Sequence, residues 1–102
     1  MPYIKPEDRV KYAEILRQAN EVFAKESTST GELNYLISSL CILWIAKQNI
    51  SYESLSDVIK TLECAKLEFY QRALVPYESA KCALSGDVGY DTLQNGARSK
   101  TP

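Results

Sequence analysis

Six polar and aromatic residues, most of them between positions 63 and 77, have the types and spacing of a site for a small anionic ligand. Lys66 and Arg72 can neutralise phosphate oxygens, and Tyr70 or Tyr77 can stack on a nucleotide base. The alternative is a solvated helix surface with weak ion pairs, such as Glu68 with Arg72 at i, i+4. The predicted ligand-binding residues are Asn34, Glu63, Lys66, Tyr70, Arg72 and Tyr77.

Carboxylates along the chain raise a second hypothesis, a helical magnesium-dependent nucleotide hydrolase. Such an enzyme needs two acids one turn apart on one helix, facing a similar pair across the bundle. Glu53 and Asp57 have i, i+4 spacing, but they lie in a first helical turn, where the helix dipole favours acids without any metal. We therefore rank metal catalysis last and predict neither a metal site nor a cofactor. The acids concerned are Glu32, Glu53, Asp57, Glu63 and Glu68.

The chain contains no histidine, which removes the commonest general base and the commonest transition-metal ligand. A serine or cysteine nucleophile then lacks its usual activating partner. The cysteines are widely spaced and form no CxxC pattern, so neither a zinc site nor a disulfide framework is indicated. We predict no catalytic residue, a protein that is not an enzyme, and a cytoplasmic location. The cysteines are Cys41, Cys64 and Cys82.

The overall composition is that of a soluble globular chain. Of 102 residues, 45% are hydrophobic and 25% are charged, and the formal net charge is -1. This balance argues against wholesale disorder and against general binding to the phosphates of DNA or RNA. The longest uncharged stretch, residues 33–46, has 14 residues, fewer than the roughly 20 that a membrane-spanning helix needs. We expect neither a membrane partner nor an export signal.

The elements that position these residues are expected to be helices, because apolar side chains recur at helical spacing along most of the chain. We predict an all-α fold with three main helices in a small bundle and a short helix after Pro76. Pro76 lacks a backbone donor and clashes with the preceding turn, so the third helix should kink or stop near Val75. The predicted helices cover about 6–26, 30–48, 52–75 and 76–84, within one domain over residues 1–85.

Local signals mark the ends of these helices. Ser29 and Glu32 have the spacing of a capping box at the start of the second helix, and Ser51 can cap the third. Gly86 breaks the helical pattern, and the residues that follow are polar and sparse in apolar groups. We therefore predict a flexible C-terminal tail over residues 86–102.

The second predicted helix, residues 30–48, is apolar around its whole circumference, so it has to be covered on all sides. In a monomeric three-helix bundle roughly a third of that surface would face water, and each exposed Leu or Ile side chain forfeits about 1.5–3 kcal/mol. We predict self-association into a homo-oligomer; the alternative is that the segment after Pro76 folds back over this helix. The predicted interface residues are Leu36, Leu40, Leu43 and Trp44.

Four blocks of sequence carry a resemblance to known proteins: MPYIKPEDR at 1–9, GELNYLI at 31–37, ECAKLEFYQR at 63–72 and PYE at 76–78. With these blocks the chain resembles a family of short, uncharacterised proteins of tailed bacteriophages and some bacteria. The resemblance implies a phage or phage-like accessory protein that acts in the bacterial cytoplasm. The loop at 28–30 and the tail after Tyr90 are particular to this chain.

Phage accessory proteins of this size that act on host immunity often do so by binding, which is an argument from analogy. We therefore expect a non-enzymatic homo-oligomer that binds or sequesters a small anionic, nucleotide-derived ligand as a counter-defence protein. The alternative is an adaptor or inhibitor that occupies a host or phage protein. The magnesium-dependent hydrolase is the third hypothesis.

Overall fold

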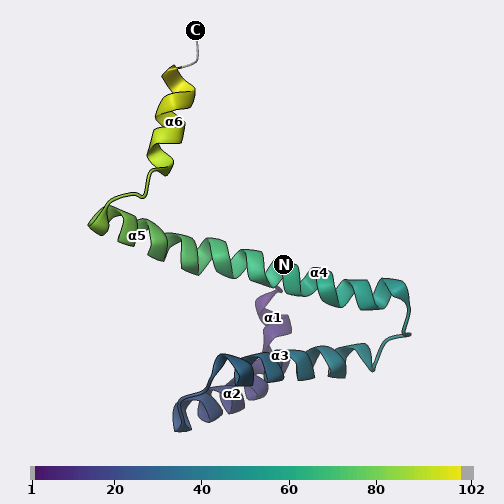
Figure 1. Ribbon diagram of the computed structural model, residues 1–102. Coiled ribbons are helices and arrows are strands. Elements are labelled where there is room, and N and C mark those ends of the chain that lie inside the picture. The colour runs from purple at the N-terminus through teal and green to yellow at the C-terminus, as the bar shows by residue number, and fades with distance from the viewer. Residues whose placement is uncertain (1, 100–102) are drawn as a thin grey trace. The chain divides into compact units, whose positions relative to one another are not determined.

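The computed structural model describes residues 2–99, and over this range the chain consists of helices and short connections (Figure 1). No strand occurs among these residues, which confirms the prediction of an all-α protein. In chain order the elements are α1 (Pro6–Arg9), a 3-10 turn (Val10–Tyr12), α2 (Ala13–Lys25), α3 (Thr30–Ile45), α4 (Tyr52–Phe69), a π-helical segment (Tyr70–Leu74), α5 (Val75–Ser85) and α6 (Tyr90–Ser99).

The predicted first helix, residues 6–26, is present as α1, the 3-10 turn and α2 in succession. Pro6 can start it because the first turn of a helix leaves its amides unpaired, so the missing proline amide costs little. The polar face of α2 is held by Arg17, whose guanidinium donates hydrogen bonds to Glu14 (Nε to Oε2, 3.0 Å) and to Glu21. The opposite, apolar stripe is therefore the surface with which α2 can pack.

α3 begins with the predicted capping box. The Oγ of Ser29 accepts a hydrogen bond from the backbone amide of Glu32 (3.2 Å), and the Glu32 carboxylate accepts one from the Ser29 amide (2.7 Å). The helix ends at Ile45 instead of the predicted residue 48. It ends earlier because the amides of Lys47 and Gln48 bond to carbonyls three residues back, which tightens the last turn.

α4 is capped by Ser51, as predicted. The Oγ of Ser51 accepts a hydrogen bond from the amide of Ser54 (3.1 Å), and the Oγ of Ser54 accepts one from the amide of Ser51 (2.9 Å). The Ser54 hydroxyl also donates to the carbonyl oxygen of Asn49 (2.8 Å). Ser54 is the one buried residue among those whose burial is described, and the hydrogen bonds of its hydroxyl offset its loss of water.

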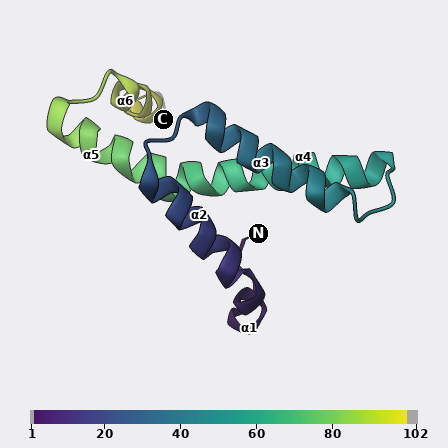
Figure 2. The same cartoon turned by 90° about the horizontal axis from the view of Figure 1, so that it is seen from below.

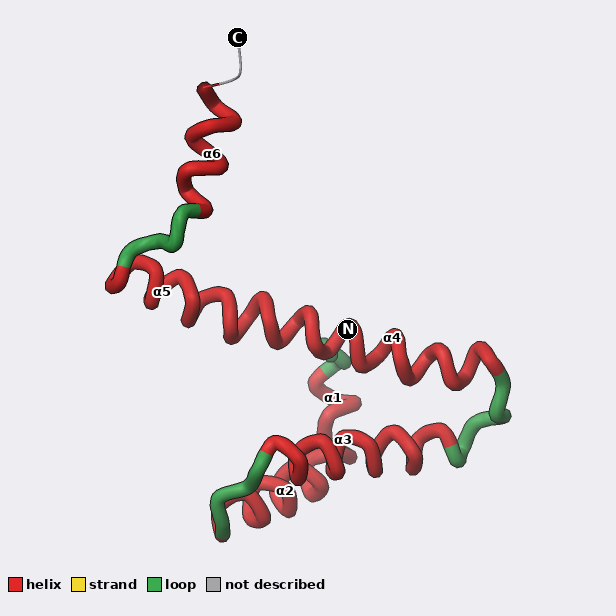
Figure 3. Tube along the Cα trace, in the orientation of Figure 1, coloured by secondary structure: helices red, strands yellow, loops and turns green. Residues whose placement is uncertain are grey.

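The helix that contains Pro76 does not stop there. Residues 52–85 are helical without interruption, and α4 passes through the π-helical segment into α5 (Figure 3). Pro76 has no amide to donate to the carbonyl of Arg72, and the wider π turn just before it accommodates the missing bond. The boundary predicted near Val75 is therefore a change of helix type.

The C-terminal part of the chain differs from the prediction. A flexible, unstructured tail was expected over residues 86–102, whereas α6 forms a helix over most of that segment. Residues 100–102 lie outside the described residues. Gly86 and Gly89 separate α5 from α6 with φ angles of 86° and 132°, a conformation that other residues adopt only with strain. The two glycines thus end one helix and allow the next to begin.

Asp87 caps the start of α6, a helix that the polar composition of this segment did not indicate. Its carboxylate accepts hydrogen bonds from the backbone amides of Val88 (2.7 Å) and Asp91 (3.1 Å) at the start of α6. Slight desolvation acts to raise the pKa of Asp87, but the bonds from backbone amides outweigh it and lower the pKa below its ordinary value. The ionised carboxylate therefore serves as a helix cap.

The chain divides by its internal contacts into two units, one up to Ala65 and one from Lys66 onward. In the first unit α3 and the beginning of α4 run in opposite directions on either side of the loop 46–51 (Figures 1 and 2). α2 joins the start of α3 through the loop 26–29 and packs closely along neither α3 nor α4 (Figure 2). This division by contacts does not test the predicted single domain over residues 1–85, which stays a prediction.

Candidate functional site

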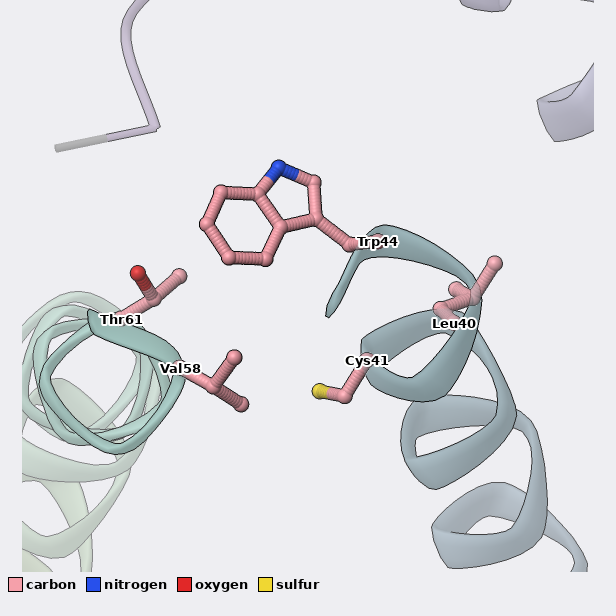
Figure 4. A pocket seen from close by; sticks show the side chains of 5 residues that line it. All are labelled: Leu40, Cys41, Trp44, Val58 and Thr61. Carbon is pink, nitrogen blue, oxygen red and sulfur yellow. The ribbon is translucent and has the colours of Figure 1, made fainter. Parts of the chain in front are cut away.

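A half-open pocket of about 350 Å³ lies between α3 and α4 in the first unit (Figure 4). α3 contributes Leu40, Cys41 and Trp44, and α4 contributes Val58 and Thr61. In Figure 4 the Cys41 sulfur and the Val58 methyl groups point toward each other across the gap between the helices, and the Trp44 indole reaches over it. The pocket is therefore a cleft between the two helices that is open to solvent on one side.

The lining of this α3–α4 pocket is almost wholly apolar. The Thr61 hydroxyl donates to the carbonyl oxygen of Asp57 in its own helix (2.8 Å), so its proton is already used. The half-buried Cys41 thiol is the one titratable group in the lining. A pocket without a charged group favours an aliphatic or aromatic side chain over an anion or a metal ion, because burying an unpaired charge is costly.

The four residues predicted to form an oligomer interface lie on α3. Leu40 and Trp44 line the pocket, and each exposes 47% of its surface. Leu43 lies outside the lining and is 63% exposed, and Leu36 is half-buried. Self-association through these residues stays a prediction, but the structure shows that α3 offers apolar surface both inside and outside the pocket.

Three lining residues, Cys41, Val58 and Thr61, were not among the predicted site residues. Cys41 lies between the predicted interface residues Leu40 and Trp44 and shares their side of the helix. Thr61 follows Val58 by three residues and so shares its side of α4. Helical spacing could therefore have found Cys41, whereas Thr61 also required knowledge of which side of α4 faces α3.

The six residues predicted to bind a small anion divide between the two units. Asn34 and Glu63 belong to the first unit, where Asn34 Oδ1 accepts a hydrogen bond from the Ser38 hydroxyl (2.9 Å). The remaining four, which belong to the second unit, are Lys66, Tyr70, Arg72 and Tyr77. Binding of an anion by this group of residues stays a prediction.

The two cationic residues of the predicted anion site, Lys66 and Arg72, lie on different sides of their helix. Lys66 and Tyr70 are one helical turn apart and therefore share a side, whereas Arg72 follows Tyr70 by only two residues and faces elsewhere. The Nη1 of Arg72 lies 3.9 Å from the Oε1 of Glu68. This is the i, i+4 pair that the sequence offered as the alternative to a ligand site.

A second, wide-open pocket of about 540 Å³ lies beside α5 and the start of α6. Its charged lining groups are the carboxylates of Glu78 and Asp87 and the ammonium of Lys81. The Lys81 ammonium lies 5.7 Å from the centre of the Tyr77 ring, a contact that their i, i+4 spacing allows. The excess of negative charge makes this pocket a poor match for an anionic ligand.

Neither a metal cluster nor a membrane span is found in the part of the chain that the structure describes. Within residues 2–99 no three cysteine, aspartate or glutamate side chains gather closely enough to hold a metal ion. The helices of this range are too short or too polar to cross a lipid bilayer. The cysteines Cys41, Cys64 and Cys82 are free thiols.

Comparison with known protein families assigns the chain to one family. A family described as a domain of unknown function (DUF6899) matches residues 1–88, which include α1 to α5 and end before α6 begins. No curated protein and no solved structure is significantly similar to the chain. Since the match covers 88 of 102 residues, this protein belongs to the DUF6899 family.

Proposed function

We propose that this protein is a non-enzymatic assembly module, which works as a homo-oligomer and acts by binding. One observation carries the proposal: among the residues whose burial is described, no apolar side chain is buried, although 45% of the chain is hydrophobic. A globular domain hides such side chains in a core of its own. Neither unit buries an apolar side chain among the described residues, so in this proposal the core is formed with other chains.

The exposed side chains of α3 give the size of the effect. Tyr35, Ile42 and Leu43 expose 76%, 65% and 63% of their surface, so each forfeits about 1–2 kcal/mol of the 1.5–3 kcal/mol that full burial gives. Together they forfeit about 3–6 kcal/mol, which is comparable with the 5–15 kcal/mol by which a whole domain is stable. An isolated chain in this conformation is therefore expected to be unstable, and burial of α3 in an interface supplies the missing stability.

A second copy of the chain is the partner that this surface fits best. Obligate homo-oligomer interfaces are more apolar than transient ones and resemble a domain core cut in half. The predicted interface residues supply such a surface, because no charged residue occurs between Leu33 and Ala46. An adaptor that covers the same surface with a host or phage protein is the alternative, and it requires the isolated chain to be monomeric.

We place this assembly in the bacterial cytoplasm, in a phage-type accessory role. The sequence blocks that resemble proteins of tailed bacteriophages support this setting. The cysteines, present as free thiols, are compatible with a reducing compartment.

A second candidate function is the binding or sequestering of a small anionic, nucleotide-derived ligand. Lys66 and Tyr70 favour it, because the ammonium can neutralise a phosphate and the neighbouring ring, 46% exposed, can stack on a base. It ranks below assembly for two reasons. The α3–α4 pocket has no charged lining residue, and the wide pocket of the second unit carries more carboxylates than cations.

Native mass spectrometry combined with sedimentation equilibrium of the full chain tests the proposal. A homo-oligomer with a fixed number of chains is the expected result. A monomer that keeps its helical circular dichroism at every concentration contradicts the proposal, and a single protein that then co-purifies with it favours the adaptor instead. Extra mass of nucleotide size on the oligomer supports the second candidate function.

A further inference from the structure

α2 carries an apolar stripe that the described part of its own chain leaves in water. Ile15, Leu16 and Val22 expose 53%, 67% and 60% of their surface, and Ala19 between them is half-buried. The opposite face of the helix is occupied by Arg17 and its two glutamate partners. A helix with one charged face and one bare apolar stripe suits an apolar groove.

A groove of this kind opens in the same unit. α3 and α4 run antiparallel without close packing, and the α3–α4 pocket lies between them. Thr61 also borders a separate, smaller hollow of about 220 Å³ on α4, whose other lining residues are Pro2, Lys60, Cys64 and Ala65. This second hollow contains a cation and a residue of the N-terminal segment, so the apolar groove proper is the pocket between α3 and α4. α2 of the same chain does not enter this groove, because it packs along neither helix (Figure 2).

The stripe and the groove match in spacing and in charge. Ile15, Leu16 and Ala19 on α2 repeat the i, i+1, i+4 pattern of the pocket residues on α3, which is the pattern of interlocking helices. Lys11 lies one turn before Ile15 at the end of the stripe, and Asp57 lies one turn before Thr61 at the edge of the groove. These opposite charges favour a pairing in which Lys11 lies near Asp57, and Lys60, beside Thr61, is the cation on the same border.

The area is sufficient for a stable dimer. The five large side chains of the stripe expose between 41% and 67% of their surface, which leaves about 500 Å² of apolar surface per chain if each side chain presents about 150–250 Å². In a two-fold dimer the two stripes alone bury about 1,000 Å², before the surface of the grooves is counted, which reaches the roughly 1,000 Å² that a specific interface needs. The stripe consists of Tyr12, Ile15, Leu16, Ala19, Val22 and Phe23.

We propose that α2 of a second copy fills the groove between α3 and α4, so that the homo-oligomer forms by exchange of α2 between chains. The proposal rests on the homo-oligomer proposed above and names the element of the partner that occupies the pocket. The four-residue connection at positions 26–29 is the hinge of this exchange. Its extended conformation at Glu26 and Ser29 separates α2 from α3.

Disulfide trapping between two differently tagged chains tests the exchange, because Cys41 already points into the pocket (Figure 4). One chain keeps Cys41 and carries Cys64→Ser and Cys82→Ser. The other carries these two changes, Cys41→Ala, and one new cysteine on α2. New cysteines are placed in turn on the stripe and on the polar face as matched controls: Ile15→Cys, Leu16→Cys and Ala19→Cys against Glu14→Cys, Arg17→Cys and Glu21→Cys.

The chains are mixed under denaturing conditions, refolded together and oxidised mildly, and cross-linked heterodimers are counted by mass. Exchange predicts cross-links from the stripe positions and at least ten times fewer from the polar-face positions, because a disulfide forms only when the two Cα atoms come within about 7 Å. Equal yields from both faces overturn the proposal.

Two further results separate this proposal from the one on which it rests. A single chain that carries both Leu16→Cys and Cys41, with the other cysteines replaced, shows whether α2 folds back within its own chain. A disulfide inside that chain, without heterodimers in the mixing experiment, overturns exchange. An oligomer by sedimentation without stripe cross-links overturns the docking of α2 but leaves self-assembly intact, whereas a monomer overturns both.

Discussion

Leu43→Ala is the perturbation that measures directly how much the exposed surface of α3 contributes to assembly. Leu43 lies on α3, outside the pocket lining, and 63% of its surface is exposed in the single chain. If the assembly buries that surface, each copy loses about 1–2 kcal/mol on substitution. A two-fold dimer contains the residue twice, so the loss is about 2–4 kcal/mol and the dissociation constant rises about 30- to 700-fold.

Sedimentation equilibrium over a wide concentration range measures this change, and circular dichroism at the same concentrations shows whether the helices persist. Leu84→Ala is the matched control, since Leu84 is 82% exposed but lies on α5 in the second unit. We expect it to leave the dissociation constant within about threefold of the original, as for surface substitutions in general. An unchanged constant for Leu43→Ala, or an equal loss for Leu84→Ala, refutes the assignment of α3 to the interface.

Four other predictions follow from the same structure. Ser29→Ala removes the capping box of α3 and is expected to lower the free energy of unfolding by about 1 kcal/mol in urea titration, whereas Thr28→Ala leaves it unchanged; equal effects of the two variants count against the cap. The Asp87 contribution to α6 is fully present above the ordinary pKa of 3.8 and is lost as the pH falls through the lowered folded value; an NMR titration of the Asp87 carboxyl carbon that gives 3.8 or more contradicts this. Folding coupled to assembly makes the thermal midpoint rise with protein concentration, and a constant midpoint in calorimetry is the opposing result. If the second candidate function holds, a nucleotide at about 100 times its dissociation constant stabilises the chain by about 2.7 kcal/mol, and Lys66→Ala removes this shift in a thermal-melt assay; a nucleotide that stabilises the variant equally excludes Lys66 from the site.

The starts of α3 and α4 could be predicted from the sequence because they depend on neighbouring residues. Ser29 with Glu32, and Ser51 before α4, satisfy amides that any helix start leaves unpaired. The elements after residue 69 were harder to predict, because at each of them one local feature opposes another. Pro76 was expected to kink or stop a helix that in fact continues past it through a π turn. The carboxylate of Asp87 starts α6 in a segment with too few apolar residues to reveal a helix.

The candidate site could be predicted only in part, because it depends on how α3 and α4 face each other. The apolar run of α3 indicated Leu40 and Trp44 as contact residues, and both line the pocket. Val58 and Thr61 come from another helix, and no local pattern states which side of α4 meets α3. The anion site was inferred from residue types and their approximate spacing along one helix, and helical geometry places Arg72 on another side than Tyr70.

The apolar residues of this chain have to serve folding and recognition together. In a monomeric bundle the stripe of α2 and the surface of α3 would form the core, and changes to them would affect stability alone. Here both remain exposed in the single chain, with Leu16 and Leu43 more than 60% exposed. In the proposed homo-oligomer, assembly would both stabilise the fold and determine the partner, because the surface that completes the core has to match it in shape. In such an assembly, selection for a stable fold and selection for the correct partner would act on the same side chains. The stretch from Leu33 to Ala46 on α3, which has no charged residue, would then be covered in the assembled state.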